Sequence, residues 1–248
     1  MTSTIEPMQR VALDSGQLMA DHPPELEDAN KRLVFNIAHP HGSRLSGQIG
    51  FTRWGAMDLP SNFSLIDVLE TTEGRADIYD YQPVSDYPSA TEWHVNFADP
   101  ELFFGYGTGL FAQAEMQVAE HTVLGSLREY SKARGYPSAT VEDRNPTPIL
   151  VSGASRSCQI RTEVNVQLNR PYGLYGNQFS FESEETARLA TDKIEPPTKS
   201  NIIAMAAPGY GWAEYTTSQV STTLTTAYTG FKAAELESAR LQGEDTLW

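Results

Sequence analysis

The sequence predicts an α/β fold in which a mixed β-sheet is flanked by helices. Short apolar segments bounded by turn-forming residues alternate along the chain with segments that have helical periodicity. With 248 residues, the chain is long enough to bury a full core without disulfide or metal cross-links. A hydrophobic share of 40% and a charged share of 20% are typical of globular proteins. We therefore expect a single domain that covers residues 1–248.

The first third of the chain begins with residues 1–30, which are rich in Pro, Asp and Glu. We expect them to form an N-terminal helical extension of one or two helices packed against the body of the domain. Residues 34–37 and 50–52 are short strand candidates, and His39-Pro40-His41-Gly42 between them favours a turn.

The middle of the chain contains a predicted strand, a Gly-rich turn and a predicted helix in succession. Residues 64–69 are expected to form a strand or a short helix, and residues 76–87 an acidic, Tyr-rich loop. Residues 93–98 are typical of a buried strand, followed by a Gly-rich turn and by a helix from about Phe111. This order places the turn at the carboxyl end of a strand, where α/β sheets bind ligands.

The remaining elements follow the same alternation. Residues 122–134 predict a helix that ends at Gly135, since glycine readily adopts the positive φ of a helix end. Strands are expected at 149–151 and 202–206, with an aromatic and Gly-rich loop at 170–181.

A C-terminal helix is predicted by an apolar stripe. Val220, Leu224, Tyr228 and Phe231 recur at steps of four, four and three residues, which is the spacing of one helical face.

The charge balance limits the possible partners. There are 18 Lys and Arg residues against 32 Asp and Glu residues, a net charge of -14, which argues against nucleic-acid binding through a basic face. An anionic ligand would have to be held locally by helix N-termini or by the backbone of Gly-rich turns.

The location expected from the sequence is cytoplasmic. No apolar run is long enough to span a bilayer, and residues 1–19 lack the basic-then-apolar order of a secretory signal. The single cysteine, Cys158, fits a reducing compartment. A metal site is not expected, because His39 and His41 have no third ligand nearby in the sequence.

The residues with the clearest catalytic pattern follow the Gly-rich turn. Gln113 and Glu115 come just after Gly105, Gly107 and Gly109, so a carboxyl group is offered beside a backbone that a ligand can approach closely. The alternative is purely structural, because an acidic residue in the first turn of a helix is favoured by the helix dipole whether or not it is catalytic.

A wider stretch resembles the catalytic signature of the poly(ADP-ribose) glycohydrolases. It consists of Val95-Asn96-Phe97-Ala98-Asp99, thirteen intervening residues and Gln113-Ala114-Glu115, and it matches the family's V-D-F-A-N and Q-E-E without a gap. Residues 172–175 are similar to the loop whose tyrosine closes over the ligand, and residues 202–206 and 227–231 are similar to a strand and a helix of the family. The resemblance implies a macrodomain-like fold, a mixed sheet flanked by helices, from Trp93 onwards.

The resemblance also implies roles for individual residues. Glu115 would be the general acid that protonates the leaving oxygen of a ribose-ribose O-glycosidic bond, and Gln113 would help to hold the loop. We expect Phe103, Phe104 and Phe111 to form an apolar wall beside Glu115. The residues expected to contact the substrate are Asn96 and Asp99 near the distal ribose, Gly105, Gly107 and Gly109 of the turn, and Tyr175 against the ligand.

Three departures from the family pattern bear on activity. Ala114 replaces the first glutamate of Q-E-E, and Phe103-Phe104-Gly105 stands where the family has three glycines. The Asp and Asn of the ribose site are exchanged, giving Asn96 and Asp99. The family's Gly-rich diphosphate loop would come after the position of Trp248.

The leading hypothesis is therefore a glycohydrolase that acts on poly(ADP-ribose) or on a related ADP-ribose adduct, such as an ADP-ribosylated protein. The alternatives are a catalytically weak or inactive ADP-ribose-binding module and a structural protein that keeps only the fold. No cofactor, DNA or membrane partner is expected.

Overall fold

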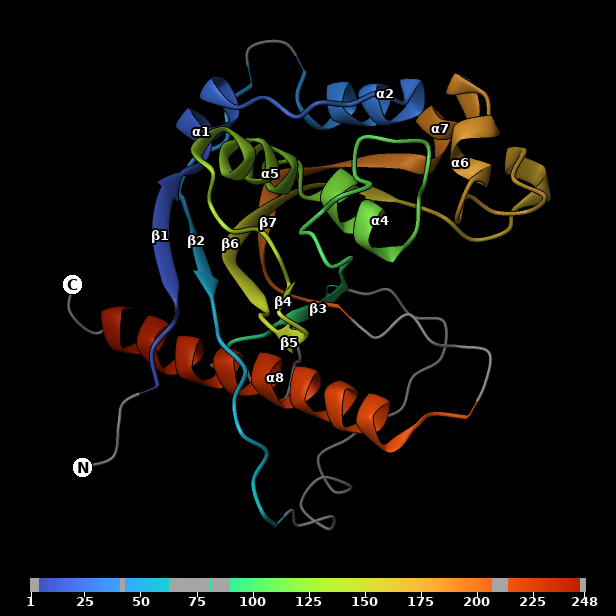
Figure 1. Ribbon diagram of the computed structural model, residues 1–248. Coiled ribbons are helices and arrows are strands. Elements are labelled where there is room, and N and C mark those ends of the chain that lie inside the picture. Colours follow the sequence, from blue (N-terminus) through green and yellow to red (C-terminus); the bar gives the residue numbers. More distant parts are fainter. Residues whose placement is uncertain (1–4, 41–42, 63–80, 82–89, 207–213, 246–248) are drawn as a thin grey trace.

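The protein folds into three layers, with a five-stranded sheet between two layers of helices (Figure 1). The structure is a computed structural model that describes residues 5–40, 43–62, 81, 90–206 and 214–245. Helix α8 covers one face of the sheet, and α1, α2, α4 and α5 cover the other. The elements are β1 (Gln9–Asp14), α1 (Ser15–Asp21), α2 (Ala29–Ala38), β2 (Gln48–Arg53), β3 (His94–Phe97), α4 (Gln113–Glu120), α5 (Val123–Arg134), β4 (Val141–Glu142), β5 (Asn145–Pro146), β6 (Ile149–Ile160), the 3-10 helix η1 (Val166–Leu168), α6 (Gln178–Phe181), α7 (Glu184–Ala190), β7 (Thr191–Met205) and α8 (Thr217–Asp245).

The predicted α/β class with a mixed sheet is confirmed. The strand order is β1-β2-β6-β7-β3, in which the first four strands are antiparallel and β3 is parallel to β7. The strands β4 and β5 form a separate two-stranded sheet.

Both faces of the central strands β6 and β7 are buried. Ile149 and Val151 belong to the core on the side of α5, whereas Leu150 between them belongs to the core on the side of α8. Ile203 in β7 likewise contacts the α8 side, and its neighbour Ile202 the opposite side. Because successive side chains of a strand point to opposite faces, these apolar runs require cover on both sides of the sheet.

Several predicted elements are confirmed. The strand candidate at residues 50–52 lies within β2, and 93–98 contains β3. The strand candidates at residues 149–151 and 202–206 are parts of much longer strands, β6 and β7. Helix α5 ends at Gly135, which has a φ of 63° as predicted, and its N–H donates to the carbonyls of Lys132 and Ser131.

Two predictions for the N-terminal region were wrong. Residues 34–37 are not a strand but part of α2, because Asp28 caps the helix at Lys31 N and the buried residues Lys31, Val34 and Ala38 recur at helical spacing. Residues 1–30 are helical only in part: α1 (Ser15–Asp21) is one of the expected helices, whereas Gln9–Asp14 forms the edge strand β1 along β2. The exposure of β1 alternates with a period of two, and its state as an edge strand depends on pairing with β2, which is distant in the chain. The segments predicted at 64–69 and 76–87 lie outside the described residues, apart from Tyr81.

The C-terminal helix is confirmed, and Tyr228 of its apolar stripe is partly buried against the core. Val220, Leu224 and Phe231 are largely exposed. The face against the sheet carries Thr229, Ala233 and Glu237 instead, at steps of four residues. Small side chains let the helix approach the sheet closely, and hydrophobic periodicity alone could not reveal that most of the apolar stripe would face outwards.

Glu237 ties this helix to the opposite end of the sequence. Its carboxylate is buried and accepts two hydrogen bonds from Arg10 of β1, at 2.8 and 2.6 Å, and one from Arg240 at 2.9 Å. The contact therefore joins α8 to the edge strand of the sheet. None of the helices built from the described residues is long and apolar enough to span a bilayer.

We expect Glu237→Ala to lower the free energy of unfolding by ~2–4 kcal/mol, because the buried carboxylate accepts several charged hydrogen bonds. Urea denaturation followed by circular dichroism would measure the loss. The control is Glu235→Ala on the same helix, where an exposed pair with Lys232 is lost and the change should stay within about 1 kcal/mol. Equal effects of the two substitutions would contradict an anchoring role for Glu237.

Candidate active site

The candidate site is a strand-turn-helix unit, as predicted. Strand β3 ends at Phe97, the chain then passes through a series of turns, and α4 begins at Gln113. The unit lies at the edge of the sheet, since β3 is the last strand in the order.

Gln113 binds the free edge of β3. Its side-chain Oε1 accepts a hydrogen bond from Phe97 N at 2.9 Å, and its Nε2 donates to Val95 O at 2.8 Å. Among the described residues, no strand pairs with this edge of β3, and both ends of the Gln113 amide bond to its backbone instead. Gln113, which was expected to hold the loop, thus holds the strand that precedes the loop.

Asn96 and Asp99 have different surroundings. Asn96 is fully buried, and its Nδ2 donates to Oε1 of Gln117 in α4 at 2.8 Å. Its Oδ1 is buried without a hydrogen-bond partner among the described residues. Asp99 is exposed, and its backbone carbonyl accepts a hydrogen bond from Oγ1 of Thr140 at 2.7 Å.

Glu115 lies beneath the loop and is only 3% exposed. Its Oε2 accepts a hydrogen bond from Ala112 N at 3.1 Å, which is the glutamate half of a capping box; Ala112 has no side-chain acceptor to form the other half. The structural alternative considered for Glu115 is therefore realised in part. Its Oε1 faces Gly105, because an ideal Cβ on this glycine would lie only 2.8 Å from that oxygen.

Lys31, which was not among the site residues predicted from the sequence, is a buried cation next to this carboxyl group. Its Nζ donates to the carbonyls of Tyr106 at 2.8 Å and Leu110 at 2.6 Å, which fixes the loop over α2. Burial lowers the pKa of Lys31 to about 8, and the nearby carboxylates of Glu115 and then Asp28 oppose this shift. The sequence does contain a signal for this buried lysine, because Lys31 falls on the same helical face as the apolar residues Val34 and Ala38.

The three glycines of the turn are packed against the protein itself. A Cβ on Gly107 would lie 2.3 Å from the carbonyl oxygen of Glu25, and one on Gly109 would lie 3.1 Å from the side chain of Ser180. The absence of side chains at 105, 107 and 109 therefore has a structural use. It lets the loop lie flat on its neighbours.

Phe103 adopts a backbone conformation typical of glycine. Its φ is 53°, in the left-handed region that bulky residues rarely occupy. It stands in the stretch where the resembled family has glycines. Phe103 and Phe111 are buried as the apolar wall requires, whereas the prediction for Phe104 was wrong, because this side chain is 65% exposed.

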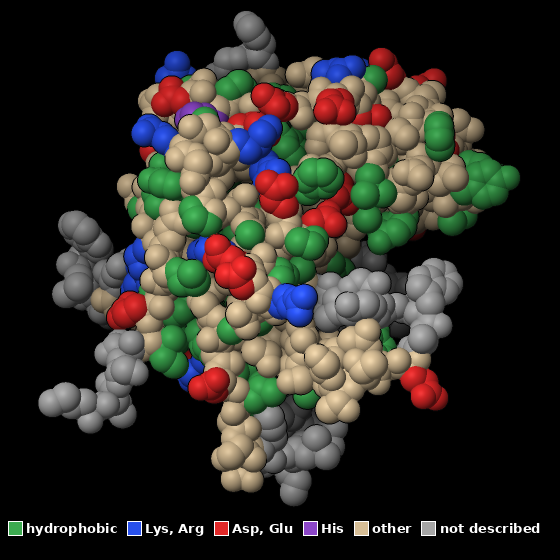
Figure 2. Space-filling view, viewed as in Figure 1, with side chains coloured by type: hydrophobic (Ala, Val, Ile, Leu, Met, Phe, Trp, Pro, Cys, Tyr) green, Lys and Arg blue, Asp and Glu red, His purple; other side chains and the backbone are tan. Residues whose placement is uncertain are grey.

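The Tyr175 loop lies beside the end of the Gly-rich turn, as expected. Phe111 and Gly176 exchange two backbone hydrogen bonds, at 3.0 and 2.9 Å. The side chain of Tyr175 is half exposed, and in Figure 2 hydrophobic side chains gather on the right, over the region of α6. The structure thus brings Glu115 and the Tyr175 loop to one edge of the domain, with Phe111 between them.

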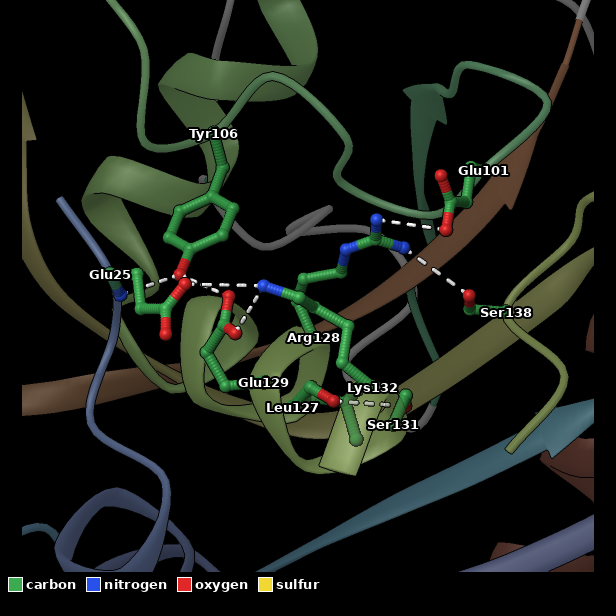
Figure 3. Close-up of polar contacts among 9 residues, drawn as sticks. All are labelled: Glu25, Glu101, Tyr106, Leu127, Arg128, Glu129, Ser131, Lys132 and Ser138. Atoms are coloured by element: carbon green, nitrogen blue, oxygen red, sulfur yellow. Dashed lines mark hydrogen bonds and ion pairs between the residues drawn. The ribbon is translucent and has the colours of Figure 1, made fainter. Parts of the chain in front are cut away.

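A polar network anchors the loop to α5 (Figure 3). The Tyr106 hydroxyl donates to Oε1 of Glu129 at 2.7 Å and accepts from Glu25 N at 2.7 Å. Lys132 bonds to the same Glu129 at 2.6 Å. Burial raises the pKa of Tyr106, so this hydroxyl stays protonated and keeps its donor role. A second anchor joins Arg128 of α5 to Glu101 at 2.9 Å.

The histidines near the site have structural surroundings. His121 is fully buried and bonds to Gln117 O and Ser200 Oγ, and burial lowers its pKa to about 3. His39 contacts Thr122 Oγ1, and burial lowers its pKa to about 4. Within the described part of the chain, no group of three or more His, Cys, Asp or Glu side chains is placed to hold a metal ion. His41 lies outside the described residues.

No protein-family model matches this chain, and no curated protein matches its sequence.

We expect Glu115→Gln to lower the pKa of Lys31 below about 8, because Glu115 is the larger of the two charges that raise it. A titration of the Lys31 side chain by heteronuclear NMR measures this directly. Glu235→Gln on the far side of the sheet is the control and should leave the titration unchanged.

The same shift has a consequence for stability. Since the folded pKa lies below the ordinary value of 10.5, the unfolded chain binds more protons between these two values, and the free energy of unfolding should rise with pH from about 8 towards 10.5. Lys31→Met should lack this rise. An unchanged pH profile in that variant would show that Lys31 keeps its ordinary pKa.

Proposed function

We propose that this protein is a glycohydrolase that cleaves the O-glycosidic bond of poly(ADP-ribose) or of a related ADP-ribose adduct, with Glu115 as the general acid. The observation that carries the proposal is the position of Glu115. One carboxyl group is held at the start of α4, beneath a glycine turn at the edge of the sheet, next to the loop that carries Tyr175. The macrodomain-like character of the fold and the cytoplasmic location are part of the same proposal.

The proposed chemistry uses Oε1 of Glu115. Oε2 is engaged by Ala112 N, which leaves Oε1, facing Gly105, as the oxygen that protonates the leaving ribose oxygen. Bond cleavage then passes through an oxocarbenium-like state, and the resulting carboxylate acts as the base that activates water. Gln113 supports the reaction indirectly, because it fixes the end of β3 against the start of α4.

A second candidate is ADP-ribose binding without turnover, and one observation favours it. Gly105 covers Oε1, and Lys31 holds the carbonyls of Tyr106 and Leu110, so a substrate reaches Glu115 only where this segment moves. Ala114, at the place of a glutamate in the resembled signature, is buried and offers no second carboxylate. In this case the ligand lies outside the loop, near the half-exposed Tyr175.

Glu115→Gln should reduce the release of ADP-ribose about a hundred- to ten-thousand-fold, because the amide keeps the shape of the side chain but cannot donate the catalytic proton. The assay follows ADP-ribose released from poly(ADP-ribose) and from a mono-ADP-ribosylated protein by chromatography. The matched control is Glu184→Gln, which removes an exposed carboxylate from the first turn of another helix, α7.

Calorimetry with ADP-ribose distinguishes the two candidates. If the unmodified protein binds ADP-ribose but releases none from either substrate, the result supports the binding module. Neither turnover nor binding would contradict both, and parent-like turnover in Glu115→Gln would assign the chemistry to another residue.

A further inference from the structure

A cavity lies along the face of α4 that carries Gln113, Gln117 and Glu120. It has a volume of about 350 Å³ and is bordered by α4, by the end of β6 and by residues 161–163. This volume is in the range of small-molecule sites. The residues used in the argument are Tyr81, Glu120, Arg156, Gln159, Arg161 and Thr162, all of which line it.

We propose that this cavity binds a small molecule through an oxyanion, a phosphate or a carboxylate, and that Arg156 is its anchor. The inference goes beyond the proposed glycohydrolase function. Glu115 is not among the residues that line the cavity, and Gln113 is the only earlier candidate residue that is.

Arg156 is held rigidly from two sides. Its Nε donates to Oε2 of Glu120 at 2.9 Å, and its guanidinium lies 4.3 Å from the ring centroid of Tyr81. Glu120 is itself fixed, because its Oε1 accepts from Ile160 N at 2.7 Å. A guanidinium oriented in this way loses little further freedom when it binds a ligand.

The two terminal nitrogens of Arg156 are the groups that would hold the anion. Its side chain is only 9% exposed, yet among the described residues no hydrogen bond engages Nη1 or Nη2. A fork of two parallel N–H groups matches the geometry of a carboxylate or phosphate. An arginine that is nine-tenths buried, lines a cavity and keeps this fork open is suited to an anionic ligand.

The other lining residues supply several donors, and Glu163, the second carboxylate of the lining, is paired with Arg170 at 2.9 Å. Gln159 and Thr162 add a side-chain amide and a hydroxyl, and Arg161 adds a second guanidinium, which pairs with Asp192. The carboxylate of Glu120 is already neutralised by Arg156. In a chain with a net charge of -14, such a local concentration of donors is the way to hold an anion.

The experiment titrates the full chain with four probes by calorimetry or NMR: inorganic phosphate, AMP, acetate and adenosine. We expect saturable binding of an oxyanion and none of adenosine at the same concentrations. Phosphate and AMP against acetate distinguish a phosphoryl ligand from a carboxylate. Glu115→Gln should leave this binding unchanged, which separates this site from the proposed glycohydrolase site.

Two variants test the anchor. The double variant Glu120→Gln with Arg156→Gln removes both charges together, so no buried charge is left unpaired, and it should weaken binding about tenfold or more. Arg156→Lys keeps the ion pair but loses the fork, and should also weaken binding. The control is Arg134→Gln, an exposed arginine at the end of α5.

The proposal is overturned if no anionic probe binds the wild-type chain saturably, or if adenosine binds as well as AMP. Wild-type affinity in a folded double variant also overturns it. Should the double variant fail to fold, Arg156→Lys decides, since wild-type affinity in that variant excludes the guanidinium fork as the anchor.

Discussion

Burial of both faces of β6 and β7 is the constraint on which the rest of the structure depends. Their consecutive apolar residues alternate between the core beneath α8 and the core beneath α5 and α4. Two helical layers are therefore required. The two outermost strands of the sheet between them, β1 and β3, are held by side-chain contacts. On one edge β1 is tied to α8 through Arg10 and Glu237; on the other, the amide of Gln113 pairs with β3.

The candidate site is built on this second edge, and buried polar contacts hold its loop. Lys31 from α2 and Tyr106 with Glu129 of α5 fix the turns between β3 and α4 from two directions. Placing charges in the interior is costly unless each finds a partner, so these contacts make the position of the loop well defined. The same contacts cover Glu115, and access to this carboxyl group therefore depends on how readily they open.

Helix α4 brings the two proposed sites together. Gln113, Gln117 and Glu120 recur at steps of four and three residues, and this face looks towards β3 and the cavity of Arg156. Glu115 projects from a different face, beneath the glycine turn. A single helix can thus present a carboxyl group to one ligand and support an arginine for another, because residues three and four apart share a face while residues two apart do not.

The sequence by itself determined the α/β class, the strand-turn-helix unit around residues 93–120 and the end of α5 at Gly135, because these depend on local periodicity and on backbone preferences of glycine. It could not identify β1, the helical state of residues 34–37 or the inner face of α8. Those depend on partners distant in the chain, such as β2 for β1 and the sheet for Ala233. Only the tertiary structure decided the surroundings of Glu115 and Arg156, since Lys31, Gly105, Glu120 and Tyr81 are brought to them by folding, and burial and charge pairing are properties of the assembled core rather than of any one segment.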